Sequence, residues 1–234
     1  GTATAVTQGQ DYPDLVASLR VDQGWGSAQL SGAIGQRKYA VANAIGAVDG
    51  DEVAWAIQGG VKINLPMLAA GDALWLQAAY ADGALGYLGW SGGSFGLGRL
   101  GKLTLADAAI NPVTGNVDTS TGWSLVAAFR HFWTPTLRTE IGASYSELKL
   151  GYVDSATAAF ALAPRSLDPK EFLLAANLIW SPVSGLDIGV EVLYSHLDIR
   201  SPVGTVSNAN VRSGILGLKS EDSVSGRLRI QRDF

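Results

Sequence analysis

The chain has 234 residues, of which 47% are apolar and only 16% are charged, and its formal net charge at pH 7 is −4. This acidic balance argues against a nucleic-acid partner, which needs a basic surface, and the absence of cysteine excludes disulfides and thiolate metal sites. No apolar run approaches the roughly 20 residues of a transmembrane helix, whereas 29 glycines, 7 tryptophans and 7 tyrosines favour many strands joined by tight turns.

The amino-terminal segment, GTATAVTQGQDYPD (1–14), is polar and rich in turn-forming residues. It lacks the basic region and the apolar core of a secretory signal peptide. An exported protein carries such a signal when it is made. We therefore expect either that the signal has been removed or that the chain starts within a longer protein.

Nine segments of alternating apolar and polar residues follow, each close to the ~9–11 residues that a tilted membrane strand requires. They cover residues 14–22, 27–36, 53–64, 73–82, 122–133, 137–148, 171–180, 186–198 and 223–234. The connections between them alternate in length. The short connections are DQGWG (22–26), LPMLAAGD (65–72), TPT (134–136) and SPVSG (181–185). The long connections cover about 37–52, 83–121, 149–170 and 199–222.

Loop lengths sorted in this way are typical of a transmembrane β-barrel, in which short periplasmic turns alternate with long extracellular loops. We therefore predict an all-β, antiparallel transmembrane barrel that forms one domain over residues 1–234. The first and last strands, 14–22 and 223–234, both descend toward the short-turn side, whereas single-chain bacterial barrels have even strand numbers. At least one strand is therefore expected before residue 1. The nine strands alone are expected to form an open, curved sheet.

Alternation along the strands separates an apolar face from a polar face. In the final segment, VSGRLRIQRDF (224–234), Leu228 and Ile230 alternate with Arg227 and Arg229. A slip of one residue would place both arginines in lipid, at about 2–4 kcal/mol each near the midplane, so the register is strongly fixed. The charged residues of the polar face are expected to line a pore. They are Arg20, Lys62, Arg130, Arg138, Glu140, Glu191, Arg227 and Arg229.

Tryptophan and tyrosine residues gather near the ends of the predicted strands. Such amphipathic rings occupy both interfaces of a membrane, so we expect two aromatic girdles. At the short-turn end they are Trp133 and Trp180. At the long-loop end they are Trp55, Tyr80, Trp123, Tyr145 and Tyr194. The alternative interpretation is that these rings belong to the core of a soluble sheet.

Little in the sequence points to catalysis or metal binding. Both histidines, His131 and His196, have outward parity near strand ends, which is more typical of an interfacial residue than of a ligand or a base. The glycine-rich segment GGSFGLGRLG (92–101) lacks the Lys-Ser/Thr of a phosphate-binding loop, and Asp51 and Glu52 are expected in a solvated loop. We expect no catalytic residue, no metal and no cofactor.

Several segments closely resemble the general porins of alphaproteobacteria, the family found in rhizobia and Brucella. They are DYPDLVASLRVDQGWGSAQLSGAIGQ (11–36), WAIQGGVKINLPMLAAGDALWLQAAYADG (55–83), FRHFWTPTLR (129–138), NLIWSPVSGLDIGVEVLYSHLD (177–198) and GRLRIQRDF (226–234). The resemblance implies a 16-stranded, trimeric pore of the bacterial outer membrane, of which this chain is the carboxy-terminal portion. It also implies contact with outer-membrane lipids and insertion by the barrel-assembly machinery, with Phe234 as the terminal residue that this machinery reads. The third extracellular loop, which narrows the pore in that family, would precede residue 1.

The function expected from this resemblance is passive diffusion of small hydrophilic solutes and ions through a water-filled channel. Two alternatives stay open. One is a surface receptor or adhesin that acts through its long loops, such as 83–121, in which the pattern predicts a hairpin of 103–110 with 116–123. The other is a barrel hydrolase, which needs a catalytic triad or dyad that the sequence does not supply.

Overall fold

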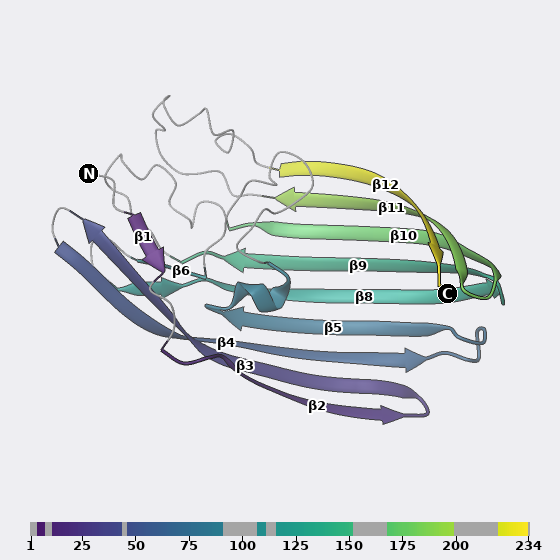
Figure 1. The fold of residues 1–234 in the computed structure, drawn as a ribbon, viewed down its shortest axis with the longest axis horizontal. Helices are drawn as coiled ribbons and strands as arrows, with labels where there is room; N and C mark the ends of the chain where they lie inside the picture. Colours follow the sequence, from purple (N-terminus) through teal and green to yellow (C-terminus); the bar gives the residue numbers. More distant parts are fainter. Residues whose placement is uncertain are drawn as a thin grey trace.

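The main feature of the computed structural model is one ten-stranded antiparallel sheet, in the order β1-β3-β4-β5-β8-β9-β10-β11-β12, with β2 also paired to β3 (Figure 1). The structure describes residues 4–7, 11–43, 46–90, 107–110, 116–151, 168–198 and 220–233. The sheet strands are β1 (Thr4–Thr7), β2 (Leu15–Gln23), β3 (Gly26–Asn43), β4 (Gly46–Asn64), β5 (Ala73–Asp82), β8 (Thr121–Thr134), β9 (Leu137–Lys149), β10 (Lys170–Val183), β11 (Leu186–Asp198) and β12 (Ser220–Arg232).

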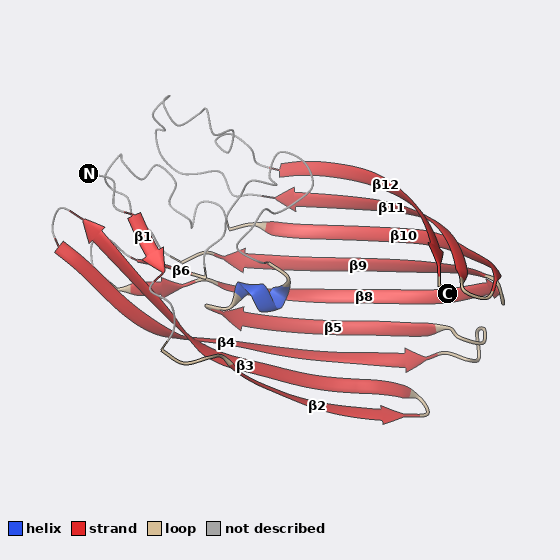
Figure 2. Ribbon diagram, in the orientation of Figure 1, coloured by secondary structure: helices blue, strands red, loops and turns tan. Residues whose placement is uncertain are grey.

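The connection between β5 and β8 contains the remaining elements. They are the 3-10 helix η1 (Leu85–Leu88) and a small hairpin of β6 (Ala108–Ile110) with β7 (Val117–Thr119). The hairpin predicted in this connection is therefore confirmed for the three pairs next to its turn, whereas Thr121–Trp123 belong to β8 and residues 103–106 lie outside the described part. Within the described residues, no helix is long and apolar enough to cross a membrane, and Figure 2 shows η1 as a single short turn beside the sheet.

Each of the nine predicted strands corresponds to one long strand of the sheet, so the predicted all-β antiparallel fold is confirmed. The short turns from β2 to β3 and from β4 to β5 lie at one end, on the right in Figure 1. The turn between β10 and β11 shows why glycine is used there. Gly185 has φ of 74°, a left-handed conformation that costs little only without a Cβ. Its carbonyl accepts a hydrogen bond of 2.8 Å from the amide of Asp233.

The prediction of a long loop over 37–52 is wrong. β3 and β4 continue through this region as a paired ribbon, from Arg37 opposite Glu52 to Asn43 opposite Gly46, and β1 pairs with the outer part of β3. Asp51 and Glu52, expected in a solvated loop, lie in β4. The physical reason is that backbone hydrogen bonds alone can pair two strands outside the bilayer, where no lipid requires one face to be apolar. The alternation of apolar and polar residues, from which strands are predicted, is therefore not required in this region.

The sheet is open, as expected for nine strands. Among the described residues no ladder joins β12 to β1 or β2, so β12 forms one edge and β1 and β2 the other. The open sheet is an incomplete barrel, and its two faces differ in chemistry.

Candidate functional site

The polar face carries a row of charged and amide side chains that runs straight across five neighbouring strands. In register, the row consists of Arg130, Glu140, Asn177, Glu191 and Arg227. The next such row toward the turns contains Arg138, Ile179, Gly189 and Arg229. We call the charged residues of these rows, with Asp187, the charged wall; they are Arg130, Arg138, Glu140, Asp187, Glu191, Arg227 and Arg229. The structure thus brings together six of the eight residues predicted to line a pore.

The β8–β10 side of the charged wall is closely paired. Arg130 Nε lies 2.7 Å from Glu140 Oε1, and the backbone amide of Glu140 donates a hydrogen bond of 3.0 Å to Asn177 Oδ1. Arg138 reaches across to β11, where its Nη2 lies 2.8 Å from Asp187 Oδ2. These contacts hold the charges in fixed positions, and each arginine has a carboxylate close by.

The β11–β12 side of the wall is loosely paired. Arg227 Nη1 lies 3.7 Å from Glu191 Oε1 and its side chain is 71% exposed. Arg229 donates to the side chain of Gln231, and within the described part of the chain it forms no ion pair. A hollow of about 310 Å³ is lined by these residues and by Arg138 and Glu140. The wall therefore presents positive charge toward the β12 edge.

The remaining two predicted pore residues lie on the same face, nearer to β2. Arg20 forms an exposed ion pair of 2.7 Å with Asp22. Lys62 lies directly opposite Trp75 on β5. Its Nζ is 5.7 Å from the centre of the indole ring, and Arg130 Cζ is 5.1 Å from the same ring. Trp75 therefore links this region to the charged wall through two cation–π contacts.

Sequence reasoning missed Trp75, although a signal was present. Trp75 shares the parity of Gln77, on the polar face, while its neighbours Leu74 and Leu76 have the opposite parity. Grouping it with the membrane-interface tryptophans by residue type alone would misplace it, because parity decides the face that a strand residue occupies.

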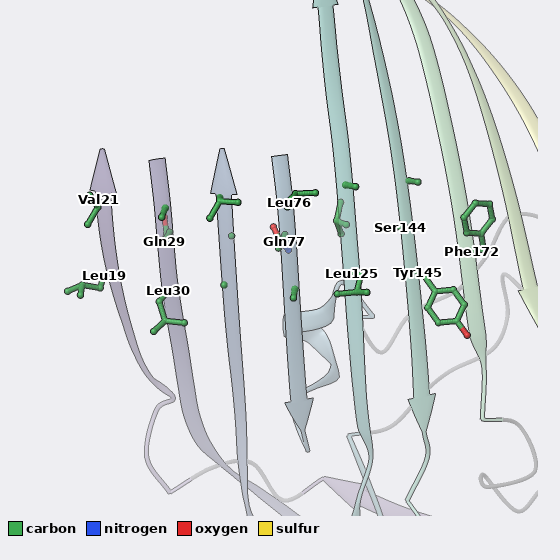
Figure 3. Close-up of a pocket in the computed structure, with 18 residues that line it drawn as sticks. Leu19, Val21, Gln29, Leu30, Leu76, Gln77, Leu125, Ser144, Tyr145 and Phe172 are labelled. Atoms are coloured by element: carbon green, nitrogen blue, oxygen red, sulfur yellow. The ribbon is translucent and has the colours of Figure 1, made fainter. Parts of the chain in front are cut away.

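The opposite face is apolar and exposed. Leu19, Leu30 and Leu125 are all at least half exposed there. A hollow of about 790 Å³ is sunk into this face, with Gly59 and Ala78 among its small residues (Figure 3). A contiguous exposed apolar surface of this extent is not stable against water, so this face is suited to lipid or to another apolar surface.

The predicted girdle aromatics lie on the apolar face, and several are brought into contact. Trp55 and Tyr80 have ring centres 5.3 Å apart, as have Trp123 and Tyr145, and Tyr194 lies beside Phe172 at 6.4 Å. The residues predicted at the short-turn end are Trp133, at the end of β8, and Trp180, near the end of β10; both are exposed. Their role in a membrane interface stays a prediction.

Each histidine on the apolar face is paired with an aspartate. His131 Nδ1 lies 2.7 Å from Asp72 Oδ2, and the amide of Phe132 donates 2.8 Å to Asp72 Oδ1. Burial raises the pKa of the Asp72 carboxyl, but these hydrogen bonds outweigh burial and hold the pKa below its ordinary value. His196 Nδ1 lies 2.8 Å from Asp222 Oδ1. Over the described ranges, no group of three or more potential ligands could hold a metal ion.

The terminal Phe234 and the glycine-rich segment 92–101 lie outside the described residues.

The fold is similar to that of a known channel. The crystal structure of the outer membrane channel DcaP of Acinetobacter baumannii matches with a TM-score of 0.63 and 16% sequence identity, covering 99% of this chain and 54% of that chain. The chain therefore spans about half the length of that channel. No curated protein matches the sequence. The model of the porin subfamily matches residues 1–227. Because this match covers nearly the whole chain, the protein belongs to the porin subfamily and is an outer-membrane β-barrel.

Proposed function

We propose that this chain is the carboxy-terminal portion of an alphaproteobacterial porin, and that the complete protein forms a water-filled channel for passive diffusion of small hydrophilic solutes and ions. The observation that carries this proposal is the separation of the two faces. An exposed apolar face suits the bilayer, while the charged wall on the opposite face suits a hydrated lumen. Such a lumen replaces part of the hydration of a passing solute.

The distribution of charge supports a weak preference for anions. The charged wall carries four arginines and three carboxylates, and its loosely paired side lies at β12, where Arg227 and Arg229 face the lumen. In water a contact between unit charges is worth about 1 kcal/mol, and salt screens it over ~8 Å at physiological ionic strength. The preference should therefore be only a few-fold.

We propose that the protein acts as a channel and not as an enzyme. A barrel hydrolase needs a general base close to its nucleophile and in reach of substrate. His131 and His196 lie on the apolar face, and each faces an aspartate. The polar face carries the charged wall, whose groups pair mainly with one another.

The assembly proposed for the complete protein is a homotrimer, inserted in the outer membrane by the barrel-assembly machinery. The resemblance of the sequence to general porins supports both proposals, and Phe234 is the residue proposed to act as the insertion signal. Cross-linking of the complete protein in outer membranes, followed by electrophoresis without heating, tests the trimer. A species of monomer size alone would contradict it.

The main test is the ion selectivity of the complete protein in planar bilayers. We expect Arg227→Ala combined with Arg229→Ala to reduce anion preference or to raise conductance, because the least compensated positive charge is removed. The measurement is the reversal potential across a salt gradient, together with single-channel conductance.

Glu140→Gln is the matched variant of opposite sign. It removes the carboxylate that faces Arg130 at 2.7 Å and should shift the reversal potential toward anions. Ser225→Ala, an uncharged change on β12, should leave the reversal potential unchanged. Reversal potentials that stay the same in both charge variants would contradict a lumen lined by the charged wall.

A further inference from the structure

The connection between β5 and β8 turns back over the polar face of the sheet at its long-loop end. On this face Ala54, Ala56 and Ala81 are buried, and they share the parity of Lys62 and of Gln77. They form one apolar cluster with Ala84, against which Leu88 of η1 packs. A patch of alanines that would otherwise face water in the lumen is therefore covered by the connection itself.

Two glycines show how closely the connection approaches the sheet. A Cβ placed on Gly122 of β8 would lie 2.9 Å from Leu88 Cδ1 and 2.3 Å from Leu148 Cδ2. A Cβ placed on Gly50 of β4 would lie 2.6 Å from Cγ2 of Val117. Both η1 and β7 therefore rest directly on the polar face, with no space between.

Arg37 holds the connection in this position. Its Nε donates to Gly83 O at 2.9 Å and to Asp107 Oδ2 at 3.2 Å, and its Nη1 lies 3.3 Å from Asp14 Oδ1. The side chain is only 15% exposed. One guanidinium thus joins β3 to both described ends of the connection and to the segment before β2. Breaking such a largely buried, multiply bonded pair costs far more than breaking a surface pair.

Asp107 has partners on its other side as well. Its Oδ1 accepts a hydrogen bond of 2.9 Å from the amide of Leu85, which begins η1. Its carbonyl accepts from the amide of Ser120 at 2.7 Å, and the carbonyl of Ser120 accepts from the amide of Gly83 at 2.8 Å. Asp107 therefore connects η1, the β6–β7 hairpin and the start of β8 through hydrogen bonds, and Arg37 binds this group of elements through its contact with Asp107. We call Arg37, Asp14 and Asp107 the mouth latch.

We propose that the described parts of the connection between β5 and β8, residues 83–90, 107–110 and 116–120, form a constriction at the mouth of the channel that is latched by Arg37, and that this constriction sets the size limit for solutes. This inference rests on the proposed channel function. The described residues of the connection lie on the polar face, away from lipid, and fill part of the cross-section of the lumen at the long-loop end of the strands. The same packing makes this connection a poorer candidate for a freely presented receptor loop, because its described parts face the lumen.

The first test removes the hydrogen bonds and ion pairs that Arg37 makes in the mouth latch. Arg37→Met keeps the length and apolar stem of the side chain but loses every donor to Gly83, Asp14 and Asp107. We expect the complete protein with this change to show higher single-channel conductance and to admit larger neutral sugars in liposome swelling. The change also removes the positive charge that faces Asp14 and Asp107, so the reversal potential should shift toward cations; swelling with neutral sugars reports the pore size independently of this charge.

The second test restores the constriction covalently. The chain has no cysteine, and a Cβ at Gly50 would lie 3.8 Å from Val117 Cβ, a spacing of about the 3.8 Å typical of disulfides. With Gly50→Cys and Val117→Cys added to Arg37→Met, oxidation should return the size limit to that of the parent. Reduction should release it again. Gly50→Cys alone and Val117→Cys alone, each added to Arg37→Met, are the controls. Their size limit should be the same under oxidising and reducing conditions.

Three results would overturn the inference. They are a failure of the cysteine pair to form a disulfide, a size limit that Arg37→Met does not change, or a widened pore that oxidation does not narrow. A parent protein without any channel activity would contradict the proposed function itself, and the inference with it.

Discussion

The two faces of this sheet are chemically opposite, and at its β12 edge they are about equally exposed. On β12, Leu228 is 68% exposed on one face, and the side chain of its neighbour Arg227 is 71% exposed on the other. In a water-soluble protein the exposure of so many apolar side chains to water would be unfavourable. Here it shows that each face meets a different medium, and that backbone ladders and the bilayer supply most of what a buried core supplies elsewhere. One exception among the described residues is the covered patch under η1, which is a small buried core of the ordinary kind.

The largest expected effect comes from putting a charge on the wrong face. Leu228→Arg places a cation in lipid and should cost about 2–4 kcal/mol if the residue lies near the midplane. Ser225→Arg adds the same side chain three residues away on the lumen face and should cost little. Urea unfolding of the complete protein in lipid vesicles measures both changes. Equal losses of stability would contradict the assignment of the two faces.

A smaller effect on stability is expected from replacing glycine by alanine, and its size should differ between the two faces. Gly122→Ala meets Leu148 and Leu88 on the covered lumen side and should destabilise the fold by about 1–3 kcal/mol through overpacking. Gly59→Ala enters the hollow of the apolar face, where the nearest atom, Leu30 Cδ1, is 3.9 Å away. It should be nearly neutral. Thermal unfolding in detergent, followed by the heat-dependent shift in electrophoretic mobility, compares the pair.

The smallest effect concerns a polar pair at the edge of the apolar face. The pKa of Asp72 is held below its ordinary value by hydrogen bonds from His131 and the Phe132 amide. A carboxyl with a lowered pKa stabilises the fold above about pH 4 and loses this contribution as the pH falls through the folded-state pKa. Asp72→Asn should therefore be less stable than the parent at pH 7, with a difference that shrinks in acid. A difference that stays constant from pH 7 to pH 3 would contradict this.

The number of long strands and the face that each of their residues occupies could be predicted from sequence, because lipid enforces a strict period of two. Leu228 and Arg229 cannot exchange places without a large penalty, so the pattern is clear. Outside the bilayer that constraint ends, so the sequence predicts a loop over 37–52, where the backbone of β3 and β4 continues as a paired ladder. The partners of Arg37 could not be predicted from the sequence either, since Asp107 lies 70 residues away along the chain and no local spacing of residues indicates such a contact.

The ribbon formed by β3 and β4 has a consequence for what lies beyond the membrane. β3 has 18 residues, so it is about 60 Å long at ~3.3 Å per residue. Tilted by ~45° it rises about 42 Å, whereas the hydrocarbon layer is ~30 Å thick. Roughly 10 Å of paired strand therefore extends beyond the hydrocarbon layer, through the depth of the headgroups. At the outer surface of the membrane an antibody or a phage would therefore meet paired β-strands, whose backbone shape is set by the ladder between β3 and β4.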